Sequence, residues 1–344
     1  MTCAQLARAL NLSRTTVSLV LNSRGPEYGI PEATIRRVRE AAQMMNYTAN
    51  PVARQLSGKR SNVVGLLINT ASIVDPRLTQ KMEVLAAARQ LRFFVGHAVG
   101  DEPQIRAYIK DFRARGVDAI IAHHHNHPVC REFIYQELAT IPRVLYFYKP
   151  EPIVKNPWYV EPDFHEVGRL ATQHLIDRGR RRIGIVGISE TLYPVMRARR
   201  VGYRGALRAA GLEYDPSLVW TLDERLSTHW SEATPESDAE AIVNELVVRQ
   251  RADAIVSGSD LEAIRLIDAL HRLGRKVPDD VSVVGTDNLG VATLVSPHVT
   301  NIDLALDKIA QASVDLLFEM IESPPGAKGH GVVVKPELIV RQSS

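Results

Sequence analysis

The alternation of apolar runs with amphipathic helical segments, from residue 63 onward, limits the fold more than any other feature. Seven nearly continuous apolar runs are typical of buried strands, and they cover residues 63–68, 93–99, 118–124, 143–148, 182–187, 253–258 and 281–286. Strands that are apolar on both faces belong to parallel sheets with helices on both sides. The number of units predicts two such sheets. Ligands in such folds bind beyond the carboxyl ends of the strands.

The first sixty residues follow a different pattern, that of short helices. Their apolar positions recur at helical spacing: Leu6, Ala7 and Leu10 in one segment, and Val17, Val20 and Leu21 in the next. Between them, Asn11 suits the left-handed backbone of a tight turn, and Ser13 can cap the second helix through its hydroxyl. These are the mechanical requirements of a helix-turn-helix.

The outward side of the second helix is short and rich in hydrogen-bonding groups. It carries Arg14, Thr15, Thr16, Ser18 and Leu19. Short hydroxyls near a helix N-terminus can hold phosphates, while Arg14 and Thr15 are placed to reach base edges in a major groove. The sequence therefore predicts a DNA-reading helix. Taken alone, the same pattern also fits a small helical bundle with no nucleic-acid partner.

A third helix is predicted from about Pro31 to Met45. Its buried stripe is Ile35, Val38, Ala41, Ala42 and Met45. The preceding segment, SRGPEYG, has two glycines and a proline, which stop the second helix and let the chain turn before the third.

Charge is unevenly distributed along the chain. Residues 1–60 hold nine arginines and lysines against three glutamates, a net charge of +6, so the remainder carries −3 of the total of +3. A basic segment on a mildly acidic body suggests that the front end meets a polyanion. A solvated basic face is the open alternative.

The segments TCAQLARALNLSRTTVSLVLN, MNY and ANPVARQLSGKRSNVVGLL resemble the lactose-repressor (LacI/GalR-type) family of bacterial transcription regulators. The resemblance implies a hinge helix over Asn50–Gly58 that folds when two copies meet on DNA. Leu56 would wedge into a minor-groove step, at a cost in unstacking that a bent duplex repays. A plain interdomain linker is the alternative. The implied DNA contacts are Thr2, Ser13, Arg14, Thr15, Thr16, Ser18, Leu19, Asn22, Asn50, Ala53 and Leu56.

Two departures from the family pattern bear on the operator sequence. The stretch from Asn22 to Thr34 carries an insertion of a few residues. Leu19 stands where many members have arginine or another polar reader.

The resemblance extends over the body through GRLATQHLIDRGRRRIGIVG, RARRVGYRGAL, SDLEAI, VPDDVSVVGTDN and PELIVRQS. It implies a periplasmic-binding-protein-like core of two Rossmann-like subdomains crossed by three connections, behind an all-α headpiece. The expected ranges are 1–46 for the headpiece, 47–61 for the hinge and 62–344 for the core. The first subdomain would cover about 62–160 and 291–320, and the second about 161–290 and 321–344.

Two effector contacts follow from matching motifs. Arg199, in RxRxxGY, is similar to the family's effector-contacting arginine, and Asp287, in VVGTDN, to its aspartate. An aspartate accepts hydrogen bonds from hydroxyls, while an arginine donates from a planar fork. The open alternatives are a surface arginine and a helix cap. Weaker candidates are Asn69, Ile73, His123, Tyr148 and Ser259.

Several cleft positions depart from the family pattern. Tyr148 replaces a frequent aspartate, Ser259 an asparagine, and Phe164 and Val167 the asparagine and glycine of a DNxxG motif. These changes indicate a reshaped cleft wall, so a sugar or sugar derivative is expected only in general terms.

Three other motifs have competing interpretations. The HHHNH run, His123–His127, suggests a metal site but lacks nearby cysteines or carboxylates, so a cleft-lining or solvated role is favoured and no metal is expected. GISET, from Gly187, lacks the final glycine of a nucleophile elbow. RGRRR, 178–182, suits a solvated helix-to-strand turn. No cofactor motif such as GxGxxG follows a strand.

The prediction is a ligand-responsive transcription regulator, a repressor and not an enzyme, that binds double-stranded DNA at a pseudo-palindromic operator as a homodimer. Two distant cysteines and the lack of a leader or long apolar run favour the cytoplasm and no membrane partner. The competing class is a small-molecule binding protein or enzyme whose front helices contact another protein. The residues do not identify the effector, whether it acts as an inducer or a corepressor, or the operator sequence.

Overall fold

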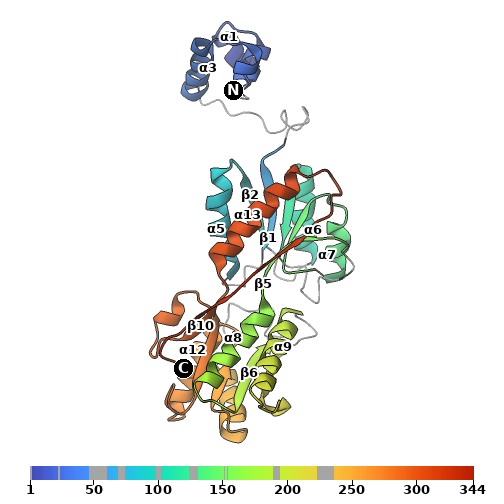
Figure 1. Cartoon of the computed structure of the whole chain (residues 1–344). Helices are drawn as coiled ribbons and strands as arrows, with labels where there is room; N and C mark the ends of the chain where they lie inside the picture. Colours follow the sequence, from blue (N-terminus) through green and yellow to red (C-terminus); the bar gives the residue numbers. More distant parts are fainter. Residues whose placement is uncertain are drawn as a thin grey trace. The chain divides into compact units, whose positions relative to one another are not determined.

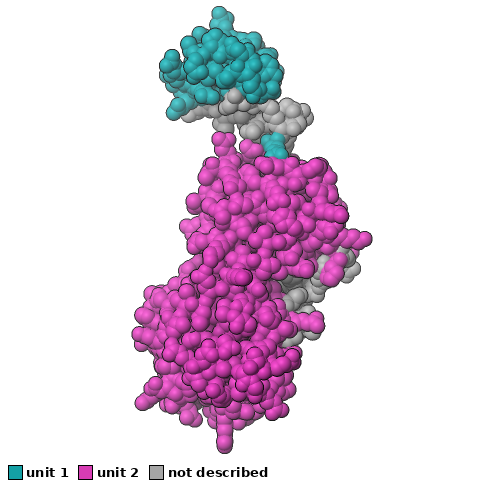
Figure 2. All heavy atoms as spheres, viewed as in Figure 1, with its two compact units in different colours: residues 1–61 teal, residues 62–344 magenta. Residues whose placement is uncertain are grey.

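The computed structural model describes residues 2–21, 24–45, 60–68, 74–97, 102–123, 131–150, 152, 154–188, 194–222 and 236–344. The chain divides into two compact units, Met1–Ser61 and Asn62–Ser344, coloured separately in Figure 2. No helix within these described ranges has the length and apolar character needed to cross a membrane.

The first unit is a small helical domain. Its elements are α1 (Cys3–Ala9), α2 (Arg14–Leu21), a 3₁₀ turn at Pro26–Tyr28 and α3 (Glu32–Met44). The three helices enclose one apolar core made of Leu6, Ala7, Val17, Val20, Ile35 and Val38. The predicted helix-turn-helix order is therefore present, with a third helix packed on it.

Local capping explains where these helices begin. Thr2 and Gln5 form a capping box at the start of α1, and the Ser13 hydroxyl accepts the Thr16 amide N–H at 2.9 Å. Asn11 has φ 52°, the left-handed turn expected between α1 and α2. One prediction was wrong: Met45 is 37% exposed, because α3 ends at Met44 and residue 45 lies in its cap beyond the core stripe.

The second unit contains two sheets (Figure 1). The first has the order β11-β5-β4-β3-β1-β2. Its strands are β1 (Val63–Ile68), β2 (Arg92–His97), β3 (Ala119–Ala122), β4 (Val144–Phe147), β5 (Trp158–Pro162) and β11 (Gly331–Val334). All the pairs are parallel.

The second sheet has the order β12-β10-β9-β8-β6-β7. Its strands are β6 (Ile183–Ile188), β7 (Val219–Leu222), β8 (Ala254–Val256), β9 (Ser282–Asp287), β10 (Thr300–Asp303) and β12 (Glu337–Ile339). Only the edge strand β12 is antiparallel, to β10. The seven predicted strands are all present, with ends shifted by one or two residues.

Helices cover both sheets. Those of the first sheet are α5 (Val74–Ala88), α6 (Glu102–Ala114), α7 (Arg131–Leu138) and α13 (Leu306–Glu322). Those of the second are α8 (Phe164–Asp177), α9 (Pro194–Ala209), α11 (Glu236–Val243), which continues as a π-helix over Asn244–Arg249, and α12 (Asp260–Arg272). Separate apolar clusters on the two faces of each sheet account for the continuous apolar strands.

The expected subdomain ranges need correction near the C-terminus. Residues 300–303 were assigned to the first subdomain, but as β10 they pair with β9 of the second sheet. Residues 331–334 were assigned to the second, but as β11 they pair with β5 of the first. The chain therefore crosses between sheets after β5, after β10 and after β11. β10 and β11 are four residues each and lack a long apolar run, so these pairings had no signal in the sequence.

Candidate functional site

The outward side of α2 is the candidate DNA-reading surface. Arg14 and Thr15 are exposed, and Thr16, Ser18 and Leu19 are half-buried, on the side of α2 away from its core residues. Thr2, at the start of α1, is exposed as well. Four predicted DNA contacts, Asn22, Asn50, Ala53 and Leu56, lie outside the described residues.

The Ser13 hydroxyl is engaged within the helix start. Besides the Thr16 amide, it lies 2.8 Å from the Thr16 hydroxyl. Ser13 therefore fixes the first turn of α2, the turn that carries Arg14 and Thr15. Its structural position supports a capping role.

The turn before α3 is braced by a charged and aromatic contact. Arg24 Nε donates to Glu27 at 2.8 Å, and Arg24 Nη2 donates to the Tyr28 hydroxyl at 2.8 Å. The Arg24 guanidinium also lies 4.9 Å from the centre of the Tyr28 ring. The described part of the inserted stretch, from Arg24 on, thus contains a structured turn that is closed by Gly29 at φ 65°.

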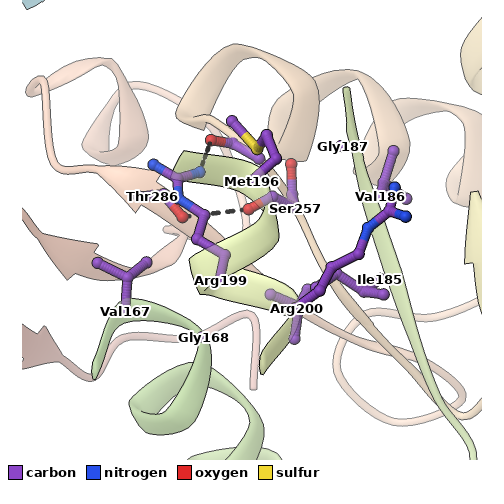
Figure 3. A pocket seen from close by; sticks show the side chains of 12 residues that line it. Val167, Gly168, Ile185, Val186, Gly187, Met196, Arg199, Arg200, Ser257 and Thr286 are labelled. Carbon is purple, nitrogen blue, oxygen red and sulfur yellow. Dashed lines mark hydrogen bonds between the residues drawn. The ribbon is translucent and has the colours of Figure 1, made fainter. Parts of the chain in front are cut away.

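In the second unit, Arg199 of α9 is buried at 8% exposure. Its Nη1 donates to the Gly258 carbonyl at 2.8 Å (Figure 3), and its Nε is buried without a partner among the described residues. Its guanidinium also lies 5.2 Å from the Phe164 ring centre. Burial lowers the pKa of Arg199, and the charge of Asp287 opposes that change. Arg199 is therefore not a surface arginine, the alternative left open by the sequence.

Asp287, the last residue of β9, is 9% exposed and has φ 99°, a strained backbone for an aspartate. Burial raises its pKa well above the usual range, against the stabilising charge of Arg199, and the carboxyls of Asp260 and Glu262 raise it further. No described residue donates a hydrogen bond to this carboxylate. It caps no helix, since the turn that follows is capped by Gly290.

The start of α12 lies next to Asp287. The Asp260 carboxylate accepts the Leu289 amide N–H at 2.7 Å, and burial raises the pKa of Asp260 to about 6. The Glu262 carboxylate accepts the Ser257 hydroxyl at 2.7 Å and the Gly258 amide N–H. These bonds fix the β8–α12 turn whose Gly258 carbonyl holds Arg199.

Ser259, predicted as an effector contact, has its hydroxyl engaged as the N-cap of α12, where it accepts the Glu262 amide N–H at 3.3 Å. The short side chain that replaces the family's asparagine therefore serves the helix start.

At the carboxyl end of the first sheet, His123 follows β3 and Tyr148 follows β4. His123 Nδ1 is hydrogen-bonded to the carboxylate of Asp75, a buried residue in the first turn of α5. The His123 ring centre lies 5.0 Å from that of Tyr148, which lies 5.2 Å from that of Phe164. Tyr148 has φ 68°, a second strained backbone at this site.

The row of rings joins the two sheets. Phe164 begins α8 on the second sheet, so the contacts run from Asp75 through His123, Tyr148 and Phe164 to Arg199. Burial raises the pKa of Tyr148, the negative charges of Asp75 and Asp287 raise it further, and the positive charge of Arg199 opposes the change.

Two small cavities flank this row, each of about 20 Å³. One lies beside Arg199, Ser257 and Thr286 (Figure 3), and the other beside Asp75, His123 and Tyr148. Each has room for about one water molecule.

Of the predicted effector residues, the structure brings together Arg199, Asp287, His123 and Tyr148, while Asn69 and Ile73 lie outside the described residues. Sequence reasoning missed Asp75 and Glu262, and treated Phe164 only as a departure from a motif. An acidic residue in the first turn after β1 was the available signal for Asp75.

The structure describes only part of the histidine run and all of the RGRRR segment. His124–His127 lie outside the described residues, and no group of three potential metal ligands occurs among those described. RGRRR lies between α8 and β6, in the helix-to-strand turn that was predicted. Its side chains also bind neighbouring elements: Arg180 donates to Ser282 Oγ at 3.0 Å, and Arg182 pairs with Asp215 at 3.1 Å.

Comparisons with known proteins agree with this arrangement. Residues 172–344 match the family described as periplasmic binding protein-like domain. The HTH-type transcriptional repressor PurR of Photobacterium profundum is 27% identical over 359 residues, covering 99% of this chain and 98% of that protein. PurR of Pectobacterium carotovorum subsp. carotovorum is 28% identical over 353 residues, covering 99% and 96%.

Two solved structures match the whole chain. The complex of the transcriptional regulator CelR with cellobiose has a TM-score of 0.71 at 25% identity, covering 100% of both chains. The Lac repressor dimer bound to operator and the anti-inducer ONPF has a TM-score of 0.81 at 20% identity, covering 100% of this chain and 98% of the other. The second likeness concerns the fold.

Proposed function

The chain belongs to the periplasmic-binding-protein-like family, as a regulator of the lactose-repressor (LacI/GalR) type, and on that premise we propose that it represses transcription by binding operator DNA under the control of a small molecule. The observation that carries the proposal is Arg199, a buried arginine at the carboxyl ends of the strands whose Nε has no partner among the described residues. It occurs in a chain whose first unit is a helix-turn-helix.

The DNA-binding part of the proposal uses the surface of α2. The capped first turn presents Arg14 and Thr15 to base edges, and Thr16 and Ser18 to phosphates. Two copies of the chain would place two such helices in successive major grooves of a pseudo-palindromic operator. Asn50, Ala53 and Leu56 would meet their counterparts in the minor groove between them.

The effector part uses the residues that the two sheets bring together. Arg199 offers a donor for a ligand oxygen, Asp287 an acceptor for a ligand donor, and the rings of Tyr148 and Phe164 an apolar wall. Such a mixture of charged and aromatic groups suits a small hydroxylated ligand of the sugar type. The cellobiose bound by CelR is an instance of this class.

Regulation follows from the contacts that cross between the sheets. A ligand that bonds Asp287 and Arg199 on one side and Tyr148 or His123 on the other favours one relative orientation of the two subdomains. It can change DNA affinity only by its differential affinity for the two orientations, typically about 1 to 3 kcal/mol.

An enzyme on the same fold is the competing proposal. The described residues around Arg199 offer carboxylates held by backbone amides and a stacked arginine. Each is fixed as a binding group, and the Ser257 hydroxyl that donates to Glu262 is buried at 1% exposure. The relatives named above are transcriptional repressors, and on both grounds binding is favoured over catalysis.

The test is selection of genomic fragments by the purified full-length chain, followed by binding isotherms over a range of salt concentrations. We expect enrichment of a pseudo-palindromic sequence, bound at least about 10³-fold more tightly than random duplex, with affinity falling steeply as salt rises. Arg14→Ala should reduce this preference, whereas Arg272→Ala, on exposed α12 surface, should not. If no sequence is enriched, the regulator proposal is wrong.

A further inference from the structure

The charges around Asp287 are out of balance. Within reach of its carboxylate lie one cation, Arg199, and two further carboxyls, Asp260 and Glu262. All three acidic side chains are buried. A buried carboxylate with more anions than cations around it is costly unless another positive group completes the site.

The other two carboxylates are held by hydrogen bonds from the protein, although Oδ1 of Asp260 is buried without a hydrogen-bond partner among the described residues. Asp260 accepts the Leu289 amide, and Glu262 accepts Ser257 and Gly258. Asp287 receives no hydrogen bond from any described residue, although it is more than nine-tenths buried. Asp287 is thus the carboxylate to which no described residue donates, and it lies at a strand end, where ligands bind in folds of this type.

Arg199 does not neutralise Asp287 by a direct contact. Its Nη1 is bonded to the Gly258 carbonyl, and the face of its guanidinium lies on the Phe164 ring. Its buried Nε, with no partner among the described residues, remains a donor for an acceptor oxygen. A ligand that fits this site therefore needs two groups, a cationic donor that binds Asp287 and an acceptor oxygen that binds Arg199.

The aromatic row supplies a matching surface. Tyr148 packs edge-to-face on His123 and Phe164, and the Phe164 ring in turn lies against the Arg199 guanidinium. Aromatic faces attract cations, and the attraction is larger where water is excluded. Carboxylates beside several rings are a common means of holding an ammonium group.

We propose that the effector carries a protonated amine, held by Asp287 beside Tyr148 and Phe164, together with a hydroxyl or ring oxygen that accepts from Arg199, as an amino sugar does. This inference rests on the proposed function and narrows the class of its effector. A neutral sugar would leave the carboxylate excess in place. A sugar acid would add a fourth negative charge to the same site.

The test is a thermal-shift comparison of matched ligands on the full-length chain at neutral pH. The probes are D-glucosamine, D-galactosamine and D-mannosamine, each against its parent hexose and its N-acetyl derivative, with D-glucuronate and hypoxanthine as further arms. The parent hexose keeps the shape of the amino sugar and has a hydroxyl in place of the charged amine, while N-acetylation removes the charge and adds an acetyl group. We expect at least one amino sugar to raise the melting temperature by about 5 °C or more at saturation. Its uncharged counterparts should have little effect.

Variants assign the effect to Asp287. Asp287→Asn should weaken the amino sugar's binding by about ten- to a hundredfold, whereas Asp287→Glu, which keeps the charge, should retain the preference for the amine. Asp268→Asn, an exposed position on α12, is the matched control and should behave as the native chain. Circular dichroism of each variant separates a loss of binding from a loss of fold.

Each other outcome overturns the proposal. The amine is excluded if the parent sugars, N-acetyl sugars, D-glucuronate or hypoxanthine stabilise the chain as well as the amino sugars do, or if no amino sugar stabilises it. Genomic selection of an operator tests the regulator function and does not require that the ligand carry an amine. If an operator is selected but no amino sugar binds, the regulator function is retained and the amine proposal is wrong. If no operator is selected, the regulator function itself is wrong.

Discussion

The contact between α8 and α9 provides a sharp test of how Arg199 is positioned. Both helices carry a glycine where they cross. A Cβ on Gly202 of α9 would lie 1.9 Å from the His165 carbonyl oxygen of α8, and a Cβ on Gly168 of α8 would lie 1.9 Å from the Arg199 carbonyl oxygen. Backbone therefore meets backbone at both points, and the registration of α9 on α8 sets where the Arg199 side chain begins.

The size of the effect follows from these distances. Ordinary contact begins at 3.4 Å, so Gly202→Ala requires the two backbones to separate by about 1.5 Å, and no flexible side chain can give way instead. Overpacking of this kind typically lowers the free energy of unfolding by about 1 to 3 kcal/mol. Because the added Cβ meets backbone and not a movable side chain, we expect a loss of about 3 kcal/mol or more. Gly205, on the same helix, has nothing within 4 Å of its Cβ. Gly205→Ala should stabilise by about 0.5 to 1 kcal/mol through helix propensity.

Urea unfolding of the two variants, followed by circular dichroism, measures the difference. Gly202→Ala should have the lower midpoint and Gly205→Ala a midpoint at or above that of the native chain, with equal slopes. If the two alanines have the same effect, the close helix contact does not constrain α9, and the explanation of how Arg199 is placed is wrong.

Three further predictions concern the other parts of the chain. Burial raises the pKa of Asp260 from 3.8 to about 6, so its contribution to folding stability is fully present below pH 3.8 and is lost as pH rises through about 6. Unfolding free energies measured from pH 3 to 8 should show this loss, of about 3 kcal/mol, in the native chain and not in Asp260→Asn; equal curves would contradict it. Ser13→Ala should destabilise α2 by about 1 kcal/mol, seen as faster hydrogen exchange of the Thr16 amide, and unchanged exchange would exclude the cap. Leu56→Ala should weaken operator binding by about tenfold or more and binding to random duplex much less, whereas equal losses would remove the minor-groove wedge.

Much of the fold was predictable because its signals are local. The strands β1, β3, β8 and β9 are buried on both faces, so they are continuous apolar runs that stand out from the amphipathic helices between them. Asn11 and Ser13 indicated the turn of the helix-turn-helix by conformational preference and capping. The assignment of the residues of β10 and β11 to sheets was wrong. Where the chain crosses between sheets, the partner of a strand depends on the path of the whole chain and not on the residues of that strand.

The site was predictable where a motif carried it and not where packing did. Arg199 and Asp287 stood in motifs, but neither the buried Nε of Arg199 nor the strained backbone of Asp287 has a sequence signal. Phe164 looked like the loss of a polar residue. Only the fold reveals that its ring lies between Tyr148 and Arg199 and so joins the two sheets. Asp75 is 48 residues from its partner His123, a separation that no local pattern spans.

Coupling between the two binding events tests the central claim most directly. Operator affinity of the full-length chain is measured with and without a saturating ligand from the thermal-shift panel, and ligand affinity with and without operator. We predict that the ligand changes operator affinity by about 5- to 150-fold and that operator changes ligand affinity by the same factor. An operator affinity that does not change when the ligand saturates the site would contradict the claim that this cleft controls DNA binding.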